Sequence, residues 1–222
     1  MNTIGGEVIQ GINKAIDLAE KDYRALVIGN DGANFSAGAN IGMIFMAAVE
    51  QEWDEINLAI KAFQNTMMRI RYSSIPVVAA PHNLTLGGGC ELCLHADHVQ
   101  TNAETYMGLV EFGVGLIPGG GGTKEFTLRL SDELREGQIE QNALRDRFLT
   151  IATAKVSTSG EEAHELGYLQ KNKYSLSMNR SRLIADAKAK AIELVEVGYT
   201  TPVRRKDIRV LGKSGLGIVY AG

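Results

Sequence analysis

Two glutamates, each close to a run of glycines, are the residues of this sequence best suited to chemistry. Glu91 ends the run Leu-Gly-Gly-Gly-Cys-Glu at 86–91, and Glu111 lies in the glycine-rich stretch 109–123. Carboxylates can accept and donate protons, and backbone N–H groups exposed in tight glycine turns can hold an oxyanion. A third small-residue turn, Asn-Phe-Ser-Ala-Gly-Ala-Asn-Ile, occupies 34–41. The sequence therefore contains the parts of a proton-transfer site.

The surroundings of both glutamates favour a function over an exposed position on a helix, which is where most glutamates lie. Glu91 follows three glycines at a predicted helix start, where backbone N–H groups favour negative charge. Glu111 stands between Val110 and Phe112, with no other charged residue over 107–123. A carboxylate among apolar residues is costly unless it is used. We therefore treat both glutamates as candidate catalytic residues.

Apolar periodicity predicts the elements that position these residues. Strand, loop and helix alternate, which indicates an α/β fold with largely parallel pairing, and such folds build their sites in loops that follow strands. The predicted helices cover 5–21, a stretch through 53–70, a segment opening at 90–94, much of the chain to about 150, and 180–197. The predicted strands cover 25–28, 76–80, 99–101 and 106–108, with a loop at 84–89.

Composition narrows the class of protein. With 222 residues, 45% of them hydrophobic, the chain can form one sizeable domain. A net charge of -3 and an aromatic content of 6% argue against nucleic-acid binding. We find no apolar run of the roughly 18–20 residues that a membrane span needs, and no secretory signal. Two cysteines imply no disulfide framework. We therefore predict a cytoplasmic protein.

Three other motifs predict neither a metal site nor a nucleotide site. Cys90, Cys93, His95 and His98 point in different directions around one helix, so we predict no metal site and expect the cysteines to be core residues. The run Gly212-Lys-Ser lacks the first glycine of a phosphate-binding loop, which would fall at Asp207. Gly113-Val-Gly lacks the third glycine of a dinucleotide fingerprint.

Taken together, the three glycine-containing motifs resemble the enoyl-CoA hydratase/isomerase (crotonase) family. The matching segments are 35–41, 86–92 and 111–123, in the family's order and spacing. The resemblance runs from about residue 5 to 170 and includes Ser159-Gly-Glu-Glu-Ala-His-Glu-Leu-Gly-Tyr-Leu. It implies an α/β crotonase-like spiral of ββα turns with a helical C-terminal part, commonly assembled as trimers or hexamers.

The resemblance also implies a role for particular residues. The backbone N–H groups of Ala39 and Gly88 would form an oxyanion hole for the carbonyl of an acyl-CoA thioester. Glu91 and Glu111 would hold one water between them. No cofactor is implied, because coenzyme A is part of the substrate. The residues expected beside the substrate are Ala37, Asn40, Ile41, Gly89, Pro118 and Gly119.

The sequence departs from the family pattern in three places. Asn40 replaces the usual aspartate, the stretch 123–155 is long and carries a charged segment at 131–147, and both ends look truncated. We therefore expect a catalytic core over 1–170 and a truncated extension over 171–222. Such a chain resembles the hydratase portion of larger proteins that also carry a 3-hydroxyacyl-CoA dehydrogenase. It would be a homo-oligomer or a neighbouring domain of a longer chain.

The sequence is compatible with three functions. The paired glutamates favour hydration of a 2-enoyl-CoA in fatty-acid oxidation. One alternative is a Δ3–Δ2 enoyl-CoA isomerase that depends mainly on Glu111. The other is an acyl-CoA-binding fragment that is inactive in isolation.

Overall fold

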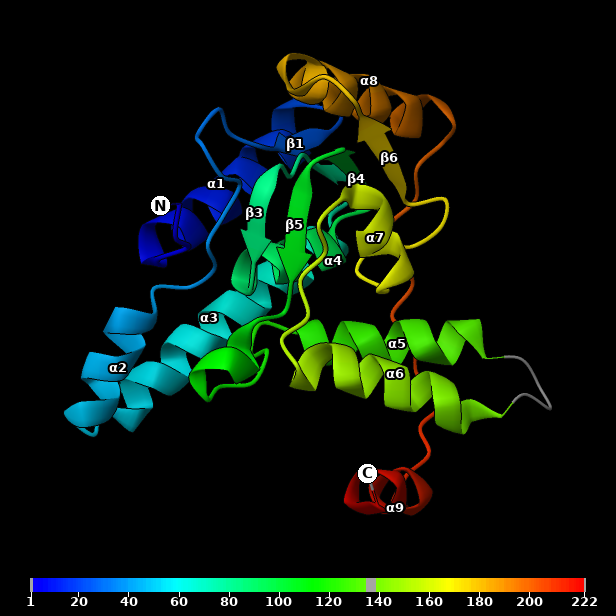
Figure 1. Ribbon diagram of the computed structural model, residues 1–222. Helices are drawn as coiled ribbons and strands as arrows, with labels where there is room; N and C mark the ends of the chain where they lie inside the picture. Colours follow the sequence, from blue (N-terminus) through cyan, green and yellow to red (C-terminus); the bar gives the residue numbers. More distant parts are fainter. Residues whose placement is uncertain (1, 135–138, 222) are drawn as a thin grey trace.

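The computed structural model describes residues 2–134 and 139–221, so part of the charged segment 131–147 lies outside the described residues. The chain folds as a mixed α/β structure (Figure 1). Its strands are β1 Leu26–Ile28, β2 Val77–Ala79, β3 Asn83–Leu86, β4 His98–Asn102, β5 Thr105–Gly108 and β6 Tyr174–Ser177. The predicted α/β class with parallel pairing is confirmed.

Helices surround these strands and fill most of the remaining chain. The α-helices are α1 Gly6–Asp22, α2 Ile41–Val49, α3 Trp53–Arg71, α4 Gly88–His95, α5 Gly122–Glu133, α6 Glu140–Ala152, α7 Gly160–Glu165, α8 Leu183–Glu196 and α9 Lys213–Ala221. The described residues also form two short 3₁₀ turns, η1 Glu111–Val114 and η2 Arg180–Arg182.

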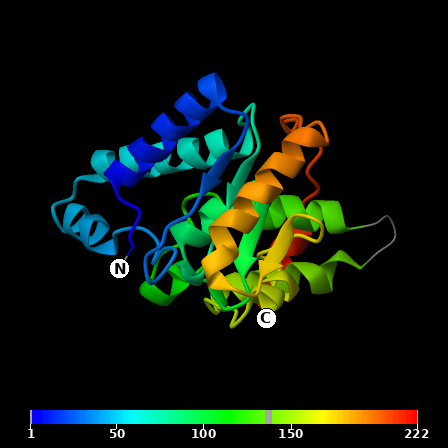
Figure 2. The same ribbon diagram turned by 90° about the horizontal axis from the view of Figure 1, so that it is seen from above.

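A four-stranded parallel sheet in the order β1-β2-β4-β6 forms the centre of the molecule. Side chains alternate across a strand, so Val77 and Ala79 enter the main core while Val78 and Ala80 face the second core under α8. Figure 2 shows α8 along one face of this sheet, with α1 and α3 on the other side. A strand buried on both faces must be apolar throughout, which explains the uninterrupted run at 77–80.

A smaller parallel sheet of β3 and β5 carries the residues of interest, because the glycine turn and α4 follow β3 while Glu111 follows β5. The predicted loop over 84–89 is wrong in its first half, since Leu84 to Leu86 pair with Tyr106 to Gly108. The predicted start of the helix at Cys90 is also late by two residues. The alternating Asn-Leu-Thr-Leu pattern is short, and the glycines that follow it obscured the strand.

Three other elements were absent from the sequence prediction: α2, β6 and α9. β6 pairs with β4 and α8 packs on β1, β2 and β4, so residues after 170 complete the central sheet. The division at residue 170 stays a prediction. No helix within the described ranges is long and apolar enough to cross a membrane.

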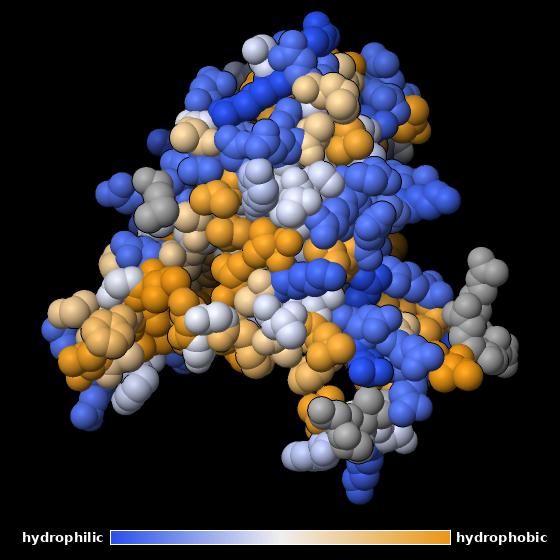
Figure 3. All heavy atoms as spheres, in the orientation of Figure 1, coloured by the Kyte–Doolittle hydropathy of each residue, from blue (hydrophilic) through white to orange (hydrophobic). Residues whose placement is uncertain are grey.

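Apolar side chains gather on one exposed part of the surface, over α2 and the neighbouring part of α3 (Figure 3). Met43, Phe45 and Val49 are 66%, 65% and 61% exposed, and Trp53 at the start of α3 is 61% exposed. The apolar sequence of α2 explains why this helix was not predicted, because it lacks an amphipathic stripe.

Candidate active site

Two glycine turns from distant parts of the chain meet at the start of α4. Gly38 and Gly87 have φ angles of +89° and +51°, a region that favours glycine. A Cβ at Gly38 would lie 3.0 Å from the Leu86 carbonyl oxygen, so a side chain there would separate the turns. The residues that follow the two glycines are Ala39 and Gly88, and a Cβ built on Gly88 would lie 3.6 Å from the Ala39 nitrogen. The structure thus brings the two predicted oxyanion donors together.

Both of these backbone N–H groups are left without an internal acceptor within the described part of the chain. Among the residues that the structure describes, neither the Ala39 N–H nor the Gly88 N–H donates a hydrogen bond. The turns are instead fixed by their neighbours, because Leu86 N donates to Ser36 O at 2.9 Å and Gly87 N donates to Gly108 O at 2.8 Å. Two adjacent, unused donors on a fixed backbone are suited to stabilising a developing oxyanion.

Glu91 lies in the first turn of α4 and is only 3% exposed. Its Oε1 accepts a hydrogen bond of 2.8 Å from the backbone N–H of Gly122, the first residue of α5. The pKa of Glu91 is raised by burial, and the N–H groups of Gly122, Gly120 and Gly121 offset part of this rise. The carboxylate therefore lies at the N-terminus of α5, where several backbone dipoles stabilise its negative charge.

Glu111 begins the turn η1 and is half-buried. It approaches the glycine turn, since a Cβ at Gly87 would lie 3.3 Å from Glu111 Oε1. Its Oε2 is buried and has no hydrogen-bond partner within the described part of the chain. Burial, and next the negative charge of nearby Glu91, raise the pKa of Glu111 to about 7. This carboxyl group can therefore both donate and accept a proton near neutral pH.

A buried charged cluster lies behind Glu91. Its centre is Glu125 of α5, a fully buried carboxylate with ion pairs to three cationic side chains: Arg71, Lys124 and Arg129. His95 Nδ1 lies 2.7 Å from the backbone oxygen of Glu91, and its Nε2 lies 3.5 Å from Glu125 Oε1. Burial lowers the pKa of His95 to about 4, so the neutral ring donates its Nδ1 proton to that oxygen. The cluster therefore ties the start of α5 to the end of α4.

Phe63 of α3 is a site residue that the sequence identified only as part of an apolar stripe. A Cβ at Gly120 would lie 2.4 Å from Glu91 Oε2 and 2.3 Å from Phe63 Cε1. A Cβ at Gly88 would lie 2.8 Å from Phe63 Cζ. The ring therefore packs between the two glycines and beside the Glu91 carboxylate, where it contributes to excluding water. Nothing in the helical spacing distinguishes Phe63 from its neighbours in the stripe.

The residues predicted along the first turn lie on the path from the oxyanion donors to α2. Ala37 N donates to the Asn2 carbonyl at 2.7 Å, and Ile41 is 44% exposed. The Asn40 side chain accepts from Met43 N at 3.4 Å as the N-cap of α2. Their contacts with a substrate stay predictions.

The other three predicted contact residues have different surroundings. Gly89 is buried, and a Cβ there would lie 2.6 Å from Ser36 Cβ, so this glycine lets α4 pack on the first turn. Pro118 is buried, and the Gly119 carbonyl accepts from Gln64 Nε2 at 2.7 Å. The Gly119 contact fixes the loop whose next three residues, Gly120 to Gly122, face Glu91.

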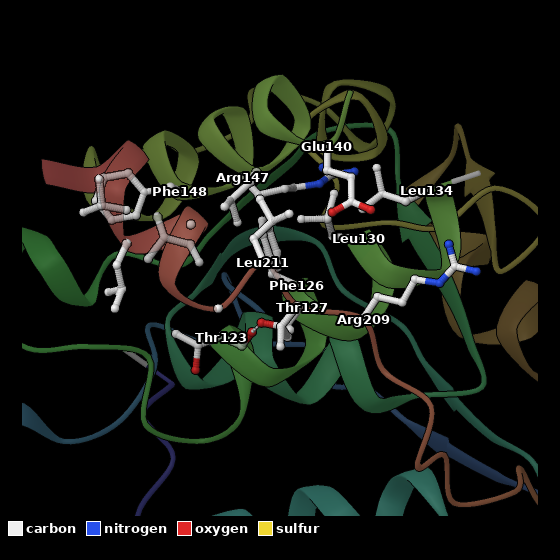
Figure 4. Close-up of a pocket in the computed structure, with 17 residues that line it drawn as sticks. Thr123, Phe126, Thr127, Leu130, Leu134, Glu140, Arg147, Phe148, Arg209 and Leu211 are labelled. Atoms are coloured by element: carbon white, nitrogen blue, oxygen red, sulfur yellow. Dashed lines mark hydrogen bonds between the residues drawn. The ribbon is translucent and has the colours of Figure 1, made fainter. Parts of the chain in front are cut away.

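Cys90 and Cys93 are fully or almost fully buried in the main core, which confirms their interpretation as core residues. A separate apolar cavity of about 360 Å³ lies between α5, α6 and α9 (Figure 4). Its lining includes Phe126, Leu130 and Phe148 but neither Glu91 nor Glu111. The candidate active site is therefore the meeting point of the two glycine turns.

The parallel strands, the paired glycine turns and the two glutamates beside them define a crotonase-type α/β fold. The chain belongs to the enoyl-CoA hydratase/isomerase family, whose model matches residues 1–136. The resemblance inferred from the three motifs is thereby confirmed.

Known proteins support this assignment. A Bacillus subtilis protein named "Probable 3-hydroxyacyl-CoA dehydrogenase" is 46% identical over 100% of this chain, which spans 27% of that relative. An enoyl-CoA hydratase structure from Polaromonas sp. JS666 has a TM-score of 0.69 and 25% identity, and the match covers 86% of this chain and 68% of the other. A second one, from Bacillus anthracis, shares the fold with a TM-score of 0.68 and 21% identity, over 99% of this chain and 80% of the other.

Proposed function

We propose that this chain catalyses the addition of water across the double bond of a 2-enoyl-CoA thioester in fatty-acid oxidation. The observation that carries the proposal is the pair of glutamates, one buried and one half-buried, beside two unused backbone N–H groups. Family membership supports the thioester as substrate. Coenzyme A then arrives as part of the substrate, and the reaction needs no further cofactor or metal.

In this reaction the N–H groups of Ala39 and Gly88 act as the oxyanion hole. They polarise the thioester carbonyl, and the enolate charge that develops during attack on the β-carbon flows onto this oxygen. Loss of one donor of this kind typically costs about 10²–10³ in rate. Stabilisation of the enolate is therefore one of the main contributions that we assign to the site.

The two carboxyl groups divide the proton transfers. Glu91, which accepts the N–H of Gly122 at the N-terminus of α5, removes a proton from the water as its oxygen bonds to the β-carbon. Glu111, whose pKa is about 7, donates a proton to the α-carbon. Glu91 ends protonated and Glu111 ionised, and exchange with solvent restores the starting state. General acid–base catalysis of this kind contributes roughly 10²–10⁴ in rate.

The wider setting of the chain also belongs to this proposal. The B. subtilis relative is much longer than this chain, which supports a hydratase unit of a larger 3-hydroxyacyl-CoA dehydrogenase-type protein with its core at 1–170 and an extension at 171–222. We propose a cytoplasmic location and assembly into trimers or hexamers, or packing against a neighbouring domain. The residues proposed to contact the acyl-CoA are Ala37, Asn40, Ile41, Gly89, Pro118 and Gly119.

The experiment is an assay of hydration with matched controls. Purified protein is mixed with a short and a long trans-2-enoyl-CoA, and loss of the conjugated thioester absorbance is followed. The control is the Glu91→Gln/Glu111→Gln double variant, with its fold verified by circular dichroism. We expect turnover by the natural chain and none by the control. A folded natural chain that turns over neither substrate contradicts the proposal.

One alternative has a specific observation in its favour. A single carboxyl group with a pKa of about 7, such as Glu111, can both accept and donate the proton that a Δ3–Δ2 isomerase moves. With a 3-enoyl-CoA, an isomerase would produce conjugated absorbance and would retain its rate after Glu91→Gln. If this chain binds acyl-CoA without turnover, and a longer chain that contains it does turn the substrate over, the chain is a fragment that is inactive in isolation.

A further inference from the structure

The segment that leads to Glu111 is paired on its outer side with residues 155–157. Gly108 forms an antiparallel bridge with Val156. Ser157 N donates to Met107 O at 2.9 Å, and Met107 N donates to Ser157 Oγ at 3.0 Å. A Cβ at Gly108 would lie 2.8 Å from the Lys155 carbonyl oxygen, so the two backbones touch at this glycine. The pairing therefore fixes β5 as far as its last residue.

One position further on, a side-chain hydroxyl joins the backbone pairing. In an antiparallel ladder the next bond would run from Leu109 N to Lys155 O. The described residues contain no direct bond between these atoms that meets normal distance and angle limits. Instead, the Tyr168 hydroxyl donates to Lys155 O at 2.6 Å and accepts from Leu109 N at 3.4 Å. The hydroxyl is thus inserted in the ladder where the chain turns toward Glu111.

Leu109 connects this hydroxyl to both glutamates. Its backbone lies two residues before Glu111, with Val110 as the only residue between them. Its side chain packs on Gly122, where a Cβ would lie 2.8 Å from Leu109 Cδ2, and Gly122 N donates to Glu91. A displacement of Leu109 would therefore be felt at Glu111 directly and at Glu91 through α5.

Packing alone does not require the hydroxyl. Tyr168 is fully buried, and its ring lies against Phe126 at a centroid distance of 5.5 Å. A phenylalanine would fill the same space in the core. The hydroxyl adds a donor and an acceptor whose partners, Lys155 O and Leu109 N, are both backbone groups beside the site. The difference between tyrosine and phenylalanine is thus concentrated on the segment carrying Glu111.

We propose that Tyr168 is a positioning residue, whose hydroxyl holds the Leu109–Glu111 segment so that the Glu111 carboxyl stays beside the Gly87 turn. This role rests on the proposed function for its effect on rate. The placement of Glu111 itself can be measured without turnover.

The test compares Tyr168→Phe with Tyr174→Phe, a matched loss of a hydroxyl that donates to the exposed Glu161 at 3.1 Å. Titration of the Glu111 carboxyl is followed by carbon-13 NMR of glutamate-labelled protein and assigned with Glu111→Gln. In Tyr168→Phe the segment loosens and water reaches the carboxyl, so its pKa falls by about one unit toward the ordinary range. Tyr174→Phe leaves this titration unchanged. An unchanged Glu111 titration in folded Tyr168→Phe overturns the proposal.

Kinetics separate this proposal from the proposed function. We expect kcat for hydration to fall about 10-fold in Tyr168→Phe with little change in KM, since the general acid is misplaced while binding is kept. In a Glu111→Gln background the same substitution should have little further effect. Equal losses in both backgrounds would contradict a role through Glu111. If the natural chain is inactive, the hydratase assignment is wrong. The NMR titration still tests whether Tyr168 positions Glu111.

A second variant covers the case in which Tyr168→Phe does not fold. Replacement of Tyr168 by 4-aminophenylalanine keeps a donor for Lys155 O and weakens the acceptor for Leu109 N–H. The Glu111 titration should again shift downward, by less than one unit. A natural titration in this variant also overturns the proposal.

Discussion

The two sides of the site treat their carboxyl groups differently. Glu91 is almost fully buried, yet its carboxylate lies at the N-terminus of α5 and receives the N–H of Gly122. Glu111 is less buried, but one of its oxygens has no partner within the described part of the chain. Backbone dipoles thus offset the cost of charge on one side, and little offsets it on the other.

The pKa of both groups is raised by burial, but only Glu91 has several backbone N–H groups that work against this rise. The group with several N–H donors is the better candidate for the ionised base, and the group with a pKa of about 7 is the better proton donor. Pairs of carboxyl groups whose surroundings separate their pKa values commonly divide acid and base roles in this way. Substitutions at or beside either glutamate test this difference between the two carboxyl groups.

The largest expected effect follows from removing the base. Glu91→Gln keeps the size of the side chain but cannot accept a proton, so we expect hydration to fall about 10³-fold, against about 10² for Glu111→Gln. Steady-state rates with a short trans-2-enoyl-CoA measure both losses. Equal losses, or a larger one at Glu111, would show that the assignment of base and acid is wrong.

A smaller effect follows from disturbing the backbone around Glu91. Gly120→Ala places a Cβ 2.4 Å from Glu91 Oε2 and must displace the carboxylate or the Phe63 ring. We expect kcat to fall about 10²-fold, since small misplacements of a reacting group have effects of this size. Gly11→Ala is the control, because a Cβ at this exposed position of α1 would meet no described atom within 4 Å. Similar rates in the two variants would contradict a requirement for this approach.

The pH dependence of hydration should report Glu111. An acid that must be protonated works below its pKa, so kcat/KM should be level below about pH 7 and fall about 10-fold per unit above it. Ionisation of Glu91 limits the acid side of the profile. Glu111→Gln should remove the alkaline limb. A limb that persists in this variant would assign it to another group.

The smallest effect concerns stability. The pKa of Glu111 is raised in the folded chain to about 7 from an ordinary 4.5, so the folded state binds more protons between these values. The contribution of the Glu111 proton to the free energy of unfolding is therefore complete below pH 4.5 and is lost as pH rises through 7. Glu111→Gln lacks this loss, so its stability relative to the natural chain should improve by about 1–3 kcal/mol from pH 4 to pH 8. Urea unfolding at both pH values measures the difference; parallel curves would rule out the raised pKa.

The sequence was sufficient to identify residues whose types are constrained by close backbone contact. Gly38, Gly87 and Gly120 are glycines because a Cβ at each position would be strained or would meet atoms at 3.3 Å or less. Such runs are visible in a sequence, and the two glutamates are visible because they stand beside them. Apolar patterning also predicted two elements correctly, the apolar strand β2 and the long amphipathic helix α3.

Residues whose importance depends on a distant partner were missed. Phe63 differs from other members of its helical stripe only in meeting Gly88 and Gly120. Tyr168 has an apolar, turn-like sequence context that gives no hint of its bonds to Lys155 and Leu109. β6 depends on pairing with β4, and propensity over four residues is too weak to predict it.

The meeting of the two glycine turns has a consequence for folding kinetics. The Ala39 and Gly88 donors belong to segments that pair around a bridge between Ser36 and Thr85, so closing the site requires a loop of some fifty residues to form. Contacts of such long sequence separation form late relative to local helices. After dilution from denaturant, recovery of catalytic competence should therefore lag behind recovery of helical structure.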